Sequence, residues 1–546
     1  MPYERFLSIA FCEFKFVLGI DSVTLDSASS IRATPPLPTV PPPLAKKPTT
    51  KPAPVSAHSD RELRARKPAG TPLSGPPTTT RPVEKRTSNS ATANPRAKED
   101  ERTQCASYAL ELLTYGGLRS HVIGGFITNN FIELQYHDRS IIVKSEPFDL
   151  TQATARFINM LNGLADLTED RWGYHPLLYT PRPTKLYPAQ GVLTHPFGGS
   201  VITLSDGRSL TVGETIFQSH AIIGRGTCVS LAKLDDVDED VVVKWSWPAK
   251  TRTPEADFVK IATEKARETG DEWVLNHLPH ILHAEQIEFD QDSPQQHLSE
   301  HFGDDYELRV LRLVVQGKLH PITELTTAAE LMISFALNLI PTGYQWLHET
   351  PKIMHRDISR HNLMYRKING KVYGVLNDFD LSVLWDKEPR STSKQRTGTE
   401  PYMALDLLVT GPPPPHLYRF DLESLFYVIA YVVCQYHEGK KIDNSPFDAW
   451  DHLGTEYLHT IKTKFLAKRT PKPTSNFSSF NDLIGELRRM FRDGYNVRED
   501  VDEDNPDFDN NSLDGKVDFK IFQPSVFGLS VMLITYCADH PIVLYG

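Results

Sequence analysis

Four polar residues stand at a spacing that suits proton transfer and metal binding. His355, Arg356 and Asp357 are consecutive, and Asn362 follows five positions after the aspartate. This order matches the pattern H-R-D-x-x-x-x-N, in which the Asp accepts a hydroxyl proton and the Asn holds a metal ion. We therefore predict Asp357, Arg356 and Asn362 as catalytic residues, and we add Lys244, which lies upstream, to this catalytic set. Asn362 is also a predicted metal ligand, and His355 has a predicted structural role.

A second acidic motif follows an apolar run that is typical of a buried strand. Asp378, Phe379 and Asp380 come shortly after Val375-Leu376. A carboxylate at the end of a buried strand is costly unless it meets a cation or a donor. We predict Asp378 as a metal and cofactor ligand and Phe379 as a structural residue. The third position of this motif is usually Gly, so Asp380 leaves open the mobility of the next segment and a second metal site.

Two glycines and a lysine upstream are candidates for holding phosphate. Gly224 and Gly226 lie between strand-like runs, where backbone N–H groups can approach an anion. Val229 stands where a third glycine is usual, and a simple β-turn is the alternative interpretation. Lys244 lies inside a β-branched run, and a buried ammonium group needs anionic neighbours. Phosphates and a helix Glu would supply them.

The helix predicted over 254–269 carries the acidic candidates for Lys244. Glu255 is the first choice, because apolar residues follow it at helical spacing and give an inward face. Glu264 is the alternative.

Thr399 and Asp421 are the last two residues that we predict to belong to the site. Residues 396–406 resemble the G-T-x-x-Y-M-A-P-E end of an activation segment and contain Thr399, which we predict as a structural or regulatory residue. Asp421 opens a helix and matches a buried Asp that braces the catalytic loop through backbone N–H groups; a plain helix cap is the alternative. A base, metal ligands and cations for phosphate are the parts that phosphoryl transfer needs.

Periodicity indicates the elements that must position these residues. Strands are predicted at 121–127, 131–135 and 141–143, in a strand-rich stretch over 194–247, and at 308–315. Helices are predicted from 104 onward and at 151–164, 254–269, 328–348, 421–436, 456–466 and 480–491.

Composition bounds the class of protein and its location. The net charge of -10 argues against a general nucleic-acid binder. The five cysteines have no paired spacing, which favours a reducing compartment. Met1–Ile20 is a poor secretory signal, and the apolar run 526–538 is short for a membrane span. We expect an intracellular protein of the cytoplasm or nucleus, with no clear membrane partner.

The stretch 35–95 holds 15 of the 41 prolines and few large apolar residues, so it is predicted to be disordered. Between residues 46 and 98, 12 Lys/Arg stand against 3 Asp/Glu. Docking to a polyanion or an import receptor is one interpretation of this basic linker, and a solvated spacer is the other.

The chain resembles the fungal-type protein kinase family. The resemblance spans about residues 104–495 and is carried by the following blocks: 243–244, 355–359, 377–381, 396–399 and 421–424. It implies an α+β, two-lobed protein kinase-like fold and an ATP- and Mg²⁺-dependent Ser/Thr kinase acting on unidentified protein substrates. It also implies that residues 104–190 belong with the kinase-like region.

On this basis the chain divides as follows: 1–30, an uncertain N-terminal segment; 31–103, a disordered basic linker; 104–190, a small α+β unit; 191–320, a β-rich small lobe; 321–497, a helical large lobe; and 498–546, an acidic tail with a short apolar C-terminus.

Other functions stay open. A pseudokinase acting as a scaffold predicts loss of Lys244, Asp357, Asn362 or Asp378, and all four are present. A small-molecule kinase of the aminoglycoside or choline type shares these residues, but Thr399 and Asp421 favour a protein kinase.

Ser359 departs from the lysine that is usual in Ser/Thr kinases, whereas Thr399 agrees with that class. Arg356 beside the base suggests that phosphorylation at Ser391, Thr392, Ser393 or Thr397 could order the segment.

Overall fold

The structure is a computed structural model, and it describes residues 95–115, 118–175, 177, 197–335, 343–387, 398–468, 471–501 and 505–522; residues 95–102 and 115 are described by their backbone alone. The predictions for residues 1–94, for the apolar run 526–538 and for the four phosphorylation positions lie outside these residues.

The first part is a small antiparallel sheet with a helix on either side. Its elements are α1 (Pro95–Tyr115), β1 (His121–Thr128), β2 (Phe131–Asp138), β3 (Ile142–Lys144), β4 (Phe148–Asp149) and α2 (Thr154–Ala165). The strand order is β1-β2-β3, and β4 pairs with β2. Strand β2 is buried on both faces. One face packs in a core with Met160 of α2, whereas Val122 of β1 packs with Leu113 of α1.

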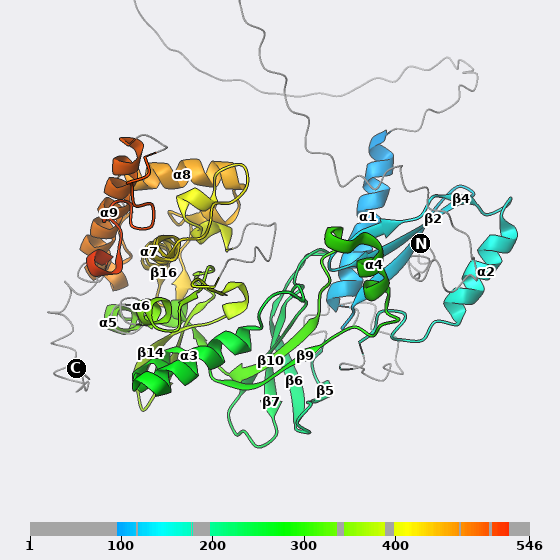
Figure 1. Cartoon of the computed structure of the whole chain (residues 1–546), viewed down its shortest axis with the longest axis horizontal. Coiled ribbons are helices and arrows are strands. Elements are labelled where there is room, and N and C mark those ends of the chain that lie inside the picture. The colour runs from blue at the N-terminus through cyan, green and yellow to red at the C-terminus, as the bar shows by residue number, and fades with distance from the viewer. Residues whose placement is uncertain are drawn as a thin grey trace, which may run out of the picture. The chain divides into compact units, whose positions relative to one another are not determined.

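A six-stranded antiparallel sheet, called the central sheet because it lies between the other two parts in the sequence, follows the first part (Figure 1). Its strands are β5 (Val201–Thr203), β6 (Ser209–Gln218), β7 (Cys228–Leu234), β8 (Val241–Ser246), β9 (Ile281–Ile287) and β10 (Leu311–Gly317), in the order β5-β6-β7-β8-β10-β9. Helix α3 (Glu255–Thr269) follows β8, and α4 (Pro294–Phe302) lies in the connection between β9 and β10. Alternating apolar residues of these strands form one core, as the period of a strand requires.

The remaining part is rich in helices. Its α-helices are α5 (Ala328–Met332), α6 (Gln345–Glu349), α7 (Tyr418–Gln435), α8 (Thr455–Ala467) and α9 (Asn481–Glu499). Its short strands are β11 (His320–Pro321), β12 (Ile353–Met354), β13 (Leu363–Ile368), β14 (Lys371–Leu376), β15 (Val383–Leu384), β16 (Tyr436–His437) and β17 (Lys440–Lys441).

Short 3₁₀ helices join these elements: η3 (Glu272–His277), η4 (Gly303–Asp305), η5 (Ile322–Glu324), η7 (Phe379–Leu381), η8 (Glu400–Tyr402), η9 (Leu405–Leu407), η10 (Asp448–Asp451) and η11 (Ser475–Phe480).

Helix α7 is the core element of the helix-rich part. All of its residues after Tyr418 are buried, which matches a sequence that is apolar on every side. Helices α8 and α9 both pack against the same apolar cluster. The structure therefore combines helices and sheets, as predicted.

Two local predictions are wrong. Residues 505–522 are not an exposed acidic tail, because Leu513, Val517 and Phe522 are buried in the core of the helix-rich part. Apolar residues spaced between acidic ones make this packing possible. The first helix begins at Pro95, inside the predicted linker, rather than near residue 104.

Within the described residues, no helix combines the length and the apolar composition that a membrane crossing requires.

Gly173 lies against the backbone of His121 at the start of β1, where a side chain would not fit. Its φ is +86°, and a Cβ atom there would lie 3.0 Å from the carbonyl carbon of His121 and closer still to its oxygen. We expect Gly173→Ala to destabilise residues 118–175 by about 3 kcal/mol, because left-handed strain and a backbone clash add up. Native-state hydrogen exchange with rising urea measures this loss.

Gly199→Ala is the matched control, because Gly199 has a φ of +83° but open space at its Cβ position. It should show only the strain, about 1 kcal/mol. Equal losses at the two glycines would contradict the assigned clash.

Candidate active site

Lys244 lies at the middle of the central sheet and meets three carboxylates. It is a residue of β8, paired with Val229 of β7 and Val314 of β10. Its Nζ lies 3.0 Å from Glu255, 2.8 Å from Asp378 and 2.9 Å from Asp380, and its side chain is only 11% exposed.

The predicted contact between Lys244 and the first acidic residue of α3 is present. Glu255 is buried and accepts a hydrogen bond from the Lys244 ammonium group. The alternative, Glu264, is exposed on the outer face of α3, where it pairs with Lys260. Helical spacing explains the choice, because Phe258, Ala262 and Glu255 share the inward face.

The charges in this group shift one another's pKa. Burial disfavours the ammonium form of Lys244, but Asp378, Asp380 and Glu255 outweigh it and raise its pKa. Burial and the two aspartates raise the pKa of Glu255 to about 8, against the attraction of Lys244. For Asp378, burial would raise the pKa, but Lys244 and Arg225 together lower it. The group therefore has an excess of negative charge, which favours the protonated form of Glu255.

Asp380 does not sit where glycine would be needed. Asp378 carries the positive φ of this segment, 62°, whereas Asp380 lies in the 3₁₀ helix η7. The Asp380 side chain is 2% exposed and binds two cations: Lys244, and Arg225 at 3.2 Å. The acidic side chain is thus an additional anion of the site and imposes no left-handed backbone strain.

Asp357 is held by two donors. Thr399 Oγ1 donates to its Oδ1 at 2.7 Å, and Asn362 Nδ2 donates to its Oδ2 at 3.2 Å. Burial and the nearby charge of Asp378 raise the pKa of Asp357, although the Thr399 hydroxyl opposes this shift. A fixed carboxylate with a raised pKa suits a general base.

As predicted from the sequence, the Asp421 carboxylate binds the backbone of the loop that contains Asp357. Its Oδ2 accepts hydrogen bonds from the backbone N–H groups of His355 at 3.1 Å and Arg356 at 3.0 Å. Tyr344 and His416, which sequence reasoning missed, also bind its carboxylate. Arg356 has a φ of 68°, so these bonds hold a left-handed backbone conformation that is costly for any residue other than glycine.

His355 and Phe379 connect the two acidic motifs. His355 Nε2 lies 3.1 Å from the carbonyl oxygen of Asn377, and its ring meets that of Phe379 edge to face with centroids 5.0 Å apart. Both side chains are fully buried. They hold the residues that flank Asp357 and Asp378 at a constant separation.

The glycine-rich turn approaches the same group. Gly224 and Gly226 have φ values of +122° and +51°, and Arg225 between them reaches Asp380. Sequence reasoning missed Arg225 and the anionic role of Asp380. The available signal was Asp380 at a position that is usually Gly, since a buried carboxylate needs a cation nearby.

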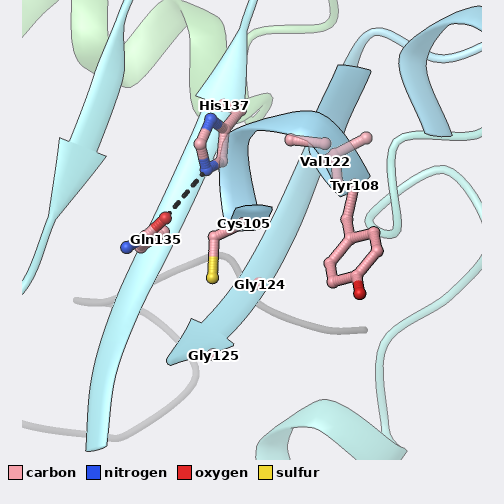
Figure 2. Close-up of a pocket in the computed structure, with 8 residues that line it drawn as sticks. Cys105, Tyr108, Val122, Gly124, Gly125, Gln135 and His137 are labelled. Atoms are coloured by element: carbon pink, nitrogen blue, oxygen red, sulfur yellow. Dashed lines mark hydrogen bonds between the residues drawn. The ribbon is translucent and has the colours of Figure 1, made fainter. Parts of the chain in front are cut away.

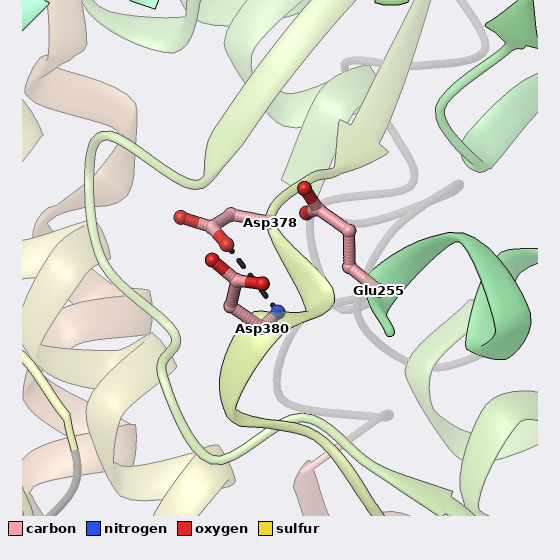
Figure 3. Close-up of side chains that lie close together, drawn as sticks. All are labelled: Glu255, Asp378 and Asp380. Carbon is pink, nitrogen blue, oxygen red and sulfur yellow. Dashed lines mark hydrogen bonds between the residues drawn. The ribbon is translucent and has the colours of Figure 1, made fainter. Parts of the chain in front are cut away.

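The acidic side chains fit a divalent cation by their chemistry. Oxygens of Glu255, Asp378 and Asp380 lie within 4.8 Å of one another, and Figure 3 shows the three side chains, Glu255 from α3 and the two aspartates from the segment 378–380. Carboxylate oxygens are preferred Mg²⁺ ligands. Of the two predicted metal ligands, Asp378 belongs to this group, whereas the amide of Asn362 binds Asp357.

A separate hollow lies on α1, β1 and β2. Figure 2 shows its lining residues, which are Cys105, Tyr108, Ala109, Val122, Gly124, Gly125, Gln135 and His137. Burial lowers the pKa of His137 to about 4, so its ring is neutral at pH 7. None of the predicted site residues lines this hollow, and it is not the candidate active site.

The raised pKa of Glu255 generates a prediction of pH dependence. Its folded-state pKa of about 8 exceeds the ordinary 4.5, so between these values the folded state binds a proton that the unfolded state has released. Stability therefore falls as pH rises toward 8. We expect the thermal midpoint to fall between pH 6 and 9, measured by tryptophan fluorescence, and to fall less in Asp380→Asn, which removes a neighbouring negative charge.

Glu255→Gln should abolish this component, whereas Glu264→Gln, on the exposed face of the same helix, should keep it. Identical pH profiles for all four proteins would contradict the raised pKa.

Comparisons with known proteins bear on the class of this site. A profile described as fungal protein kinase matches residues 87–433, which is more than half of the chain. No curated protein matches. Among solved structures, the kinase PK-1 of the Cydia pomonella granulovirus is similar, with 14% identity and a TM-score of 0.33; the alignment covers 51% of this chain and 87% of that one. The family match confirms the resemblance found in the motifs, and the chain belongs to the fungal protein kinase family.

Proposed function

We propose that the chain is an ATP- and Mg²⁺-dependent protein kinase of the Ser/Thr type, which transfers the γ-phosphate of ATP to a protein hydroxyl. The observation that carries this proposal is the simultaneous contact of Lys244 with Glu255 and Asp378. A kinase needs both the lysine–glutamate pair and the metal-binding Asp in place. In this proposal the central sheet with α3 is the small lobe, and the helix-rich part is the large lobe.

Asp357 would act on the substrate hydroxyl. Its carboxylate is fixed by Thr399 and Asn362, so it can present an oxygen to the attacking group without a search of rotamers. The raised pKa increases its proton affinity and brings it closer to the operating pH. Asp357 therefore accepts the hydroxyl proton as the phosphate is transferred.

Lys244 and the acidic group would bind the nucleotide. Lys244 has three donors and can exchange one carboxylate for a phosphate oxygen while Glu255 keeps its position. Asp378 and Asn362 would hold Mg²⁺, with Asp380 close to them. When bound, the metal ion neutralises phosphate charge that builds up during transfer. Gly224 and Gly226 would let the backbone of the turn approach phosphate closely, with the N–H groups of residues 225 and 226 as donors, because that of Gly224 binds Arg139.

The choice of a Ser/Thr protein substrate rests on Thr399. Its hydroxyl binds Asp357 directly, a contact that the sequence indicated for Ser/Thr enzymes. Asp421 supports the loop beneath it. We further propose that the substrate is a protein, that the basic linker binds a polyanion or an import receptor, and that the chain works in the cytoplasm or nucleus.

A phosphate-transfer assay on generic protein substrates tests the proposal. Asp357→Asn should lower kcat by about 10²-fold or more, because the general base is lost. Lys244→Met should lower kcat/KM by at least as much, because it leaves three clustered carboxylates, two of them buried, without their main cation. Removal of Mg²⁺ with EDTA should stop transfer.

Lys265→Met is the matched control, since this lysine lies on the exposed side of α3 and pairs only with Glu268 among the ion pairs described. It should keep full activity. Tight nucleotide binding without any phosphate transfer by the unmodified protein would support a scaffold function instead. Transfer to an aminoglycoside or choline but not to protein would support a small-molecule kinase.

A further inference from the structure

Arg139 connects the first part of the chain to the glycine-rich turn. It follows strand β2, and its side chain is 3% exposed. Its Nη1 donates to the carbonyl oxygen of Ala221 at 2.6 Å, and its Nη2 donates to that of Leu113 in α1 at 2.8 Å. Its own carbonyl oxygen accepts a hydrogen bond from the N–H of Gly224 at 2.8 Å. Both the backbone and the side chain of Arg139 therefore bind residues 221–224.

Gly226 is small because Arg139 lies against it. A Cβ atom at position 226 would lie 2.5 Å from Nε and 2.8 Å from Nη1 of Arg139, distances that real Cβ atoms do not adopt. Gly224, which has a similar left-handed preference, has nothing within 4 Å of that position. Different constraints therefore favour glycine at the two positions. Gly226 accommodates a guanidinium group, and Gly224 accommodates only the backbone conformation.

Arg139 itself cannot move easily, because the residues on either side of it are fixed. Asp138 accepts hydrogen bonds from the hydroxyls of Tyr136 and Tyr306, at 2.9 Å and 2.7 Å. Ser140 donates to the carbonyl oxygen of Glu307 at 2.6 Å. These contacts tie the turn after β2 to the segment that leads into β10, so Arg139 presents its guanidinium group to the glycine-rich turn from a rigid support.

Residues that come later in the chain also hold the turn. Arg225 pairs with Asp380, and its carbonyl oxygen accepts a hydrogen bond from the N–H of Trp247 at 2.7 Å. Gly224 and Gly226 on either side of it bind or abut Arg139. Residues 221–226 are therefore held by contacts with Arg139, Asp380 and Trp247.

We propose that Arg139 is a positioning residue for the phosphate-binding turn, through which residues 118–175 set the affinity for nucleotide. The inference rests on the proposed kinase function and adds to it. Arg139 does not contact the reacting groups; it binds the N–H group of Gly224 and thereby holds the backbone N–H groups of residues 225 and 226 where phosphate oxygens would bind. The small sheet of β1–β4 is then a working part of the nucleotide site.

Two substitutions at Arg139 test the mechanism. Arg139→Met keeps the apolar length but loses both hydrogen bonds, and Arg139→Lys keeps the charge but lacks the planar guanidinium fork that reaches Ala221 and Leu113 from two separate nitrogens. Both should raise the Kd for a fluorescent Mg–ATP analogue and the KM for ATP by about tenfold or more, because misplaced binding groups lose affinity steeply. The kcat at saturating ATP should change by less than about threefold.

A double-mutant cycle separates the clash at Gly226 from ordinary strain. Gly226→Ala should weaken nucleotide binding strongly in the unmodified protein but much less in the Arg139→Met background, where the guanidinium group is gone. Gly224→Ala is the matched control, because its cost is backbone strain alone and should be the same in both backgrounds. An equal cost for Gly226→Ala in both backgrounds would overturn the inference.

Hydrogen exchange without nucleotide tests the same link independently of function. Exchange of residues 219–227 should increase in both Arg139 variants, while β1 and β2 keep their protection, which shows that the first part remains folded. If the unmodified protein binds no nucleotide, the proposed function fails and this measurement alone decides the role of Arg139. Unchanged exchange of the turn would overturn the inference.

Discussion

The candidate site depends on the burial of one ammonium group. Lys244 lies in a strand with apolar neighbours, and a cation in that position requires anions close by. The anions come from α3 and from η7, so the lysine fixes one helix of the sheet-rich part against a segment more than one hundred residues later. A third carboxylate, Asp380, would leave the group too negative. Arg225 supplies the second cation, so three carboxylates face two positive charges.

Asp421 has a comparable effect on the catalytic loop. Its buried carboxylate binds two successive backbone N–H groups and two side chains, which is enough to keep its pKa low even though burial alone would raise it. Holding Arg356 at a positive φ costs on the order of 1–3 kcal/mol, and the bonds to Asp421 offset that cost. The position of Asp357 therefore depends on an interaction made by its neighbours. Its own carboxylate remains available to a substrate, apart from its contacts with Thr399 and Asn362.

Local patterns were sufficient where one element decides the contact. The helical spacing after Glu255 predicted which acidic residue of α3 faces Lys244, and the motif around Asp421 predicted a buried Asp that binds backbone N–H groups of the loop. They were insufficient where two residues far apart in the chain form a pair. Arg225 and Asp380 are 155 positions apart, and neither residue alone indicates its partner. Residues 505–522 were misjudged for a related reason, because acidic side chains mask the spacing of Leu513 and Phe522.

The same reasoning accounts for Val229, the other departure from the usual glycine-rich pattern. A third glycine gives a phosphate-binding turn conformational freedom, which must be lost when a ligand binds. Here Arg139 and Asp380 hold the turn from two sides, and Val229 is already a strand residue paired with Lys244. A β-branched side chain suits that position better than glycine does. For the proposed nucleotide, a turn that is ordered in advance reduces the entropic cost of binding. Val229 in place of a third glycine and the ion pair between Arg225 and Asp380 therefore both favour an ordered turn.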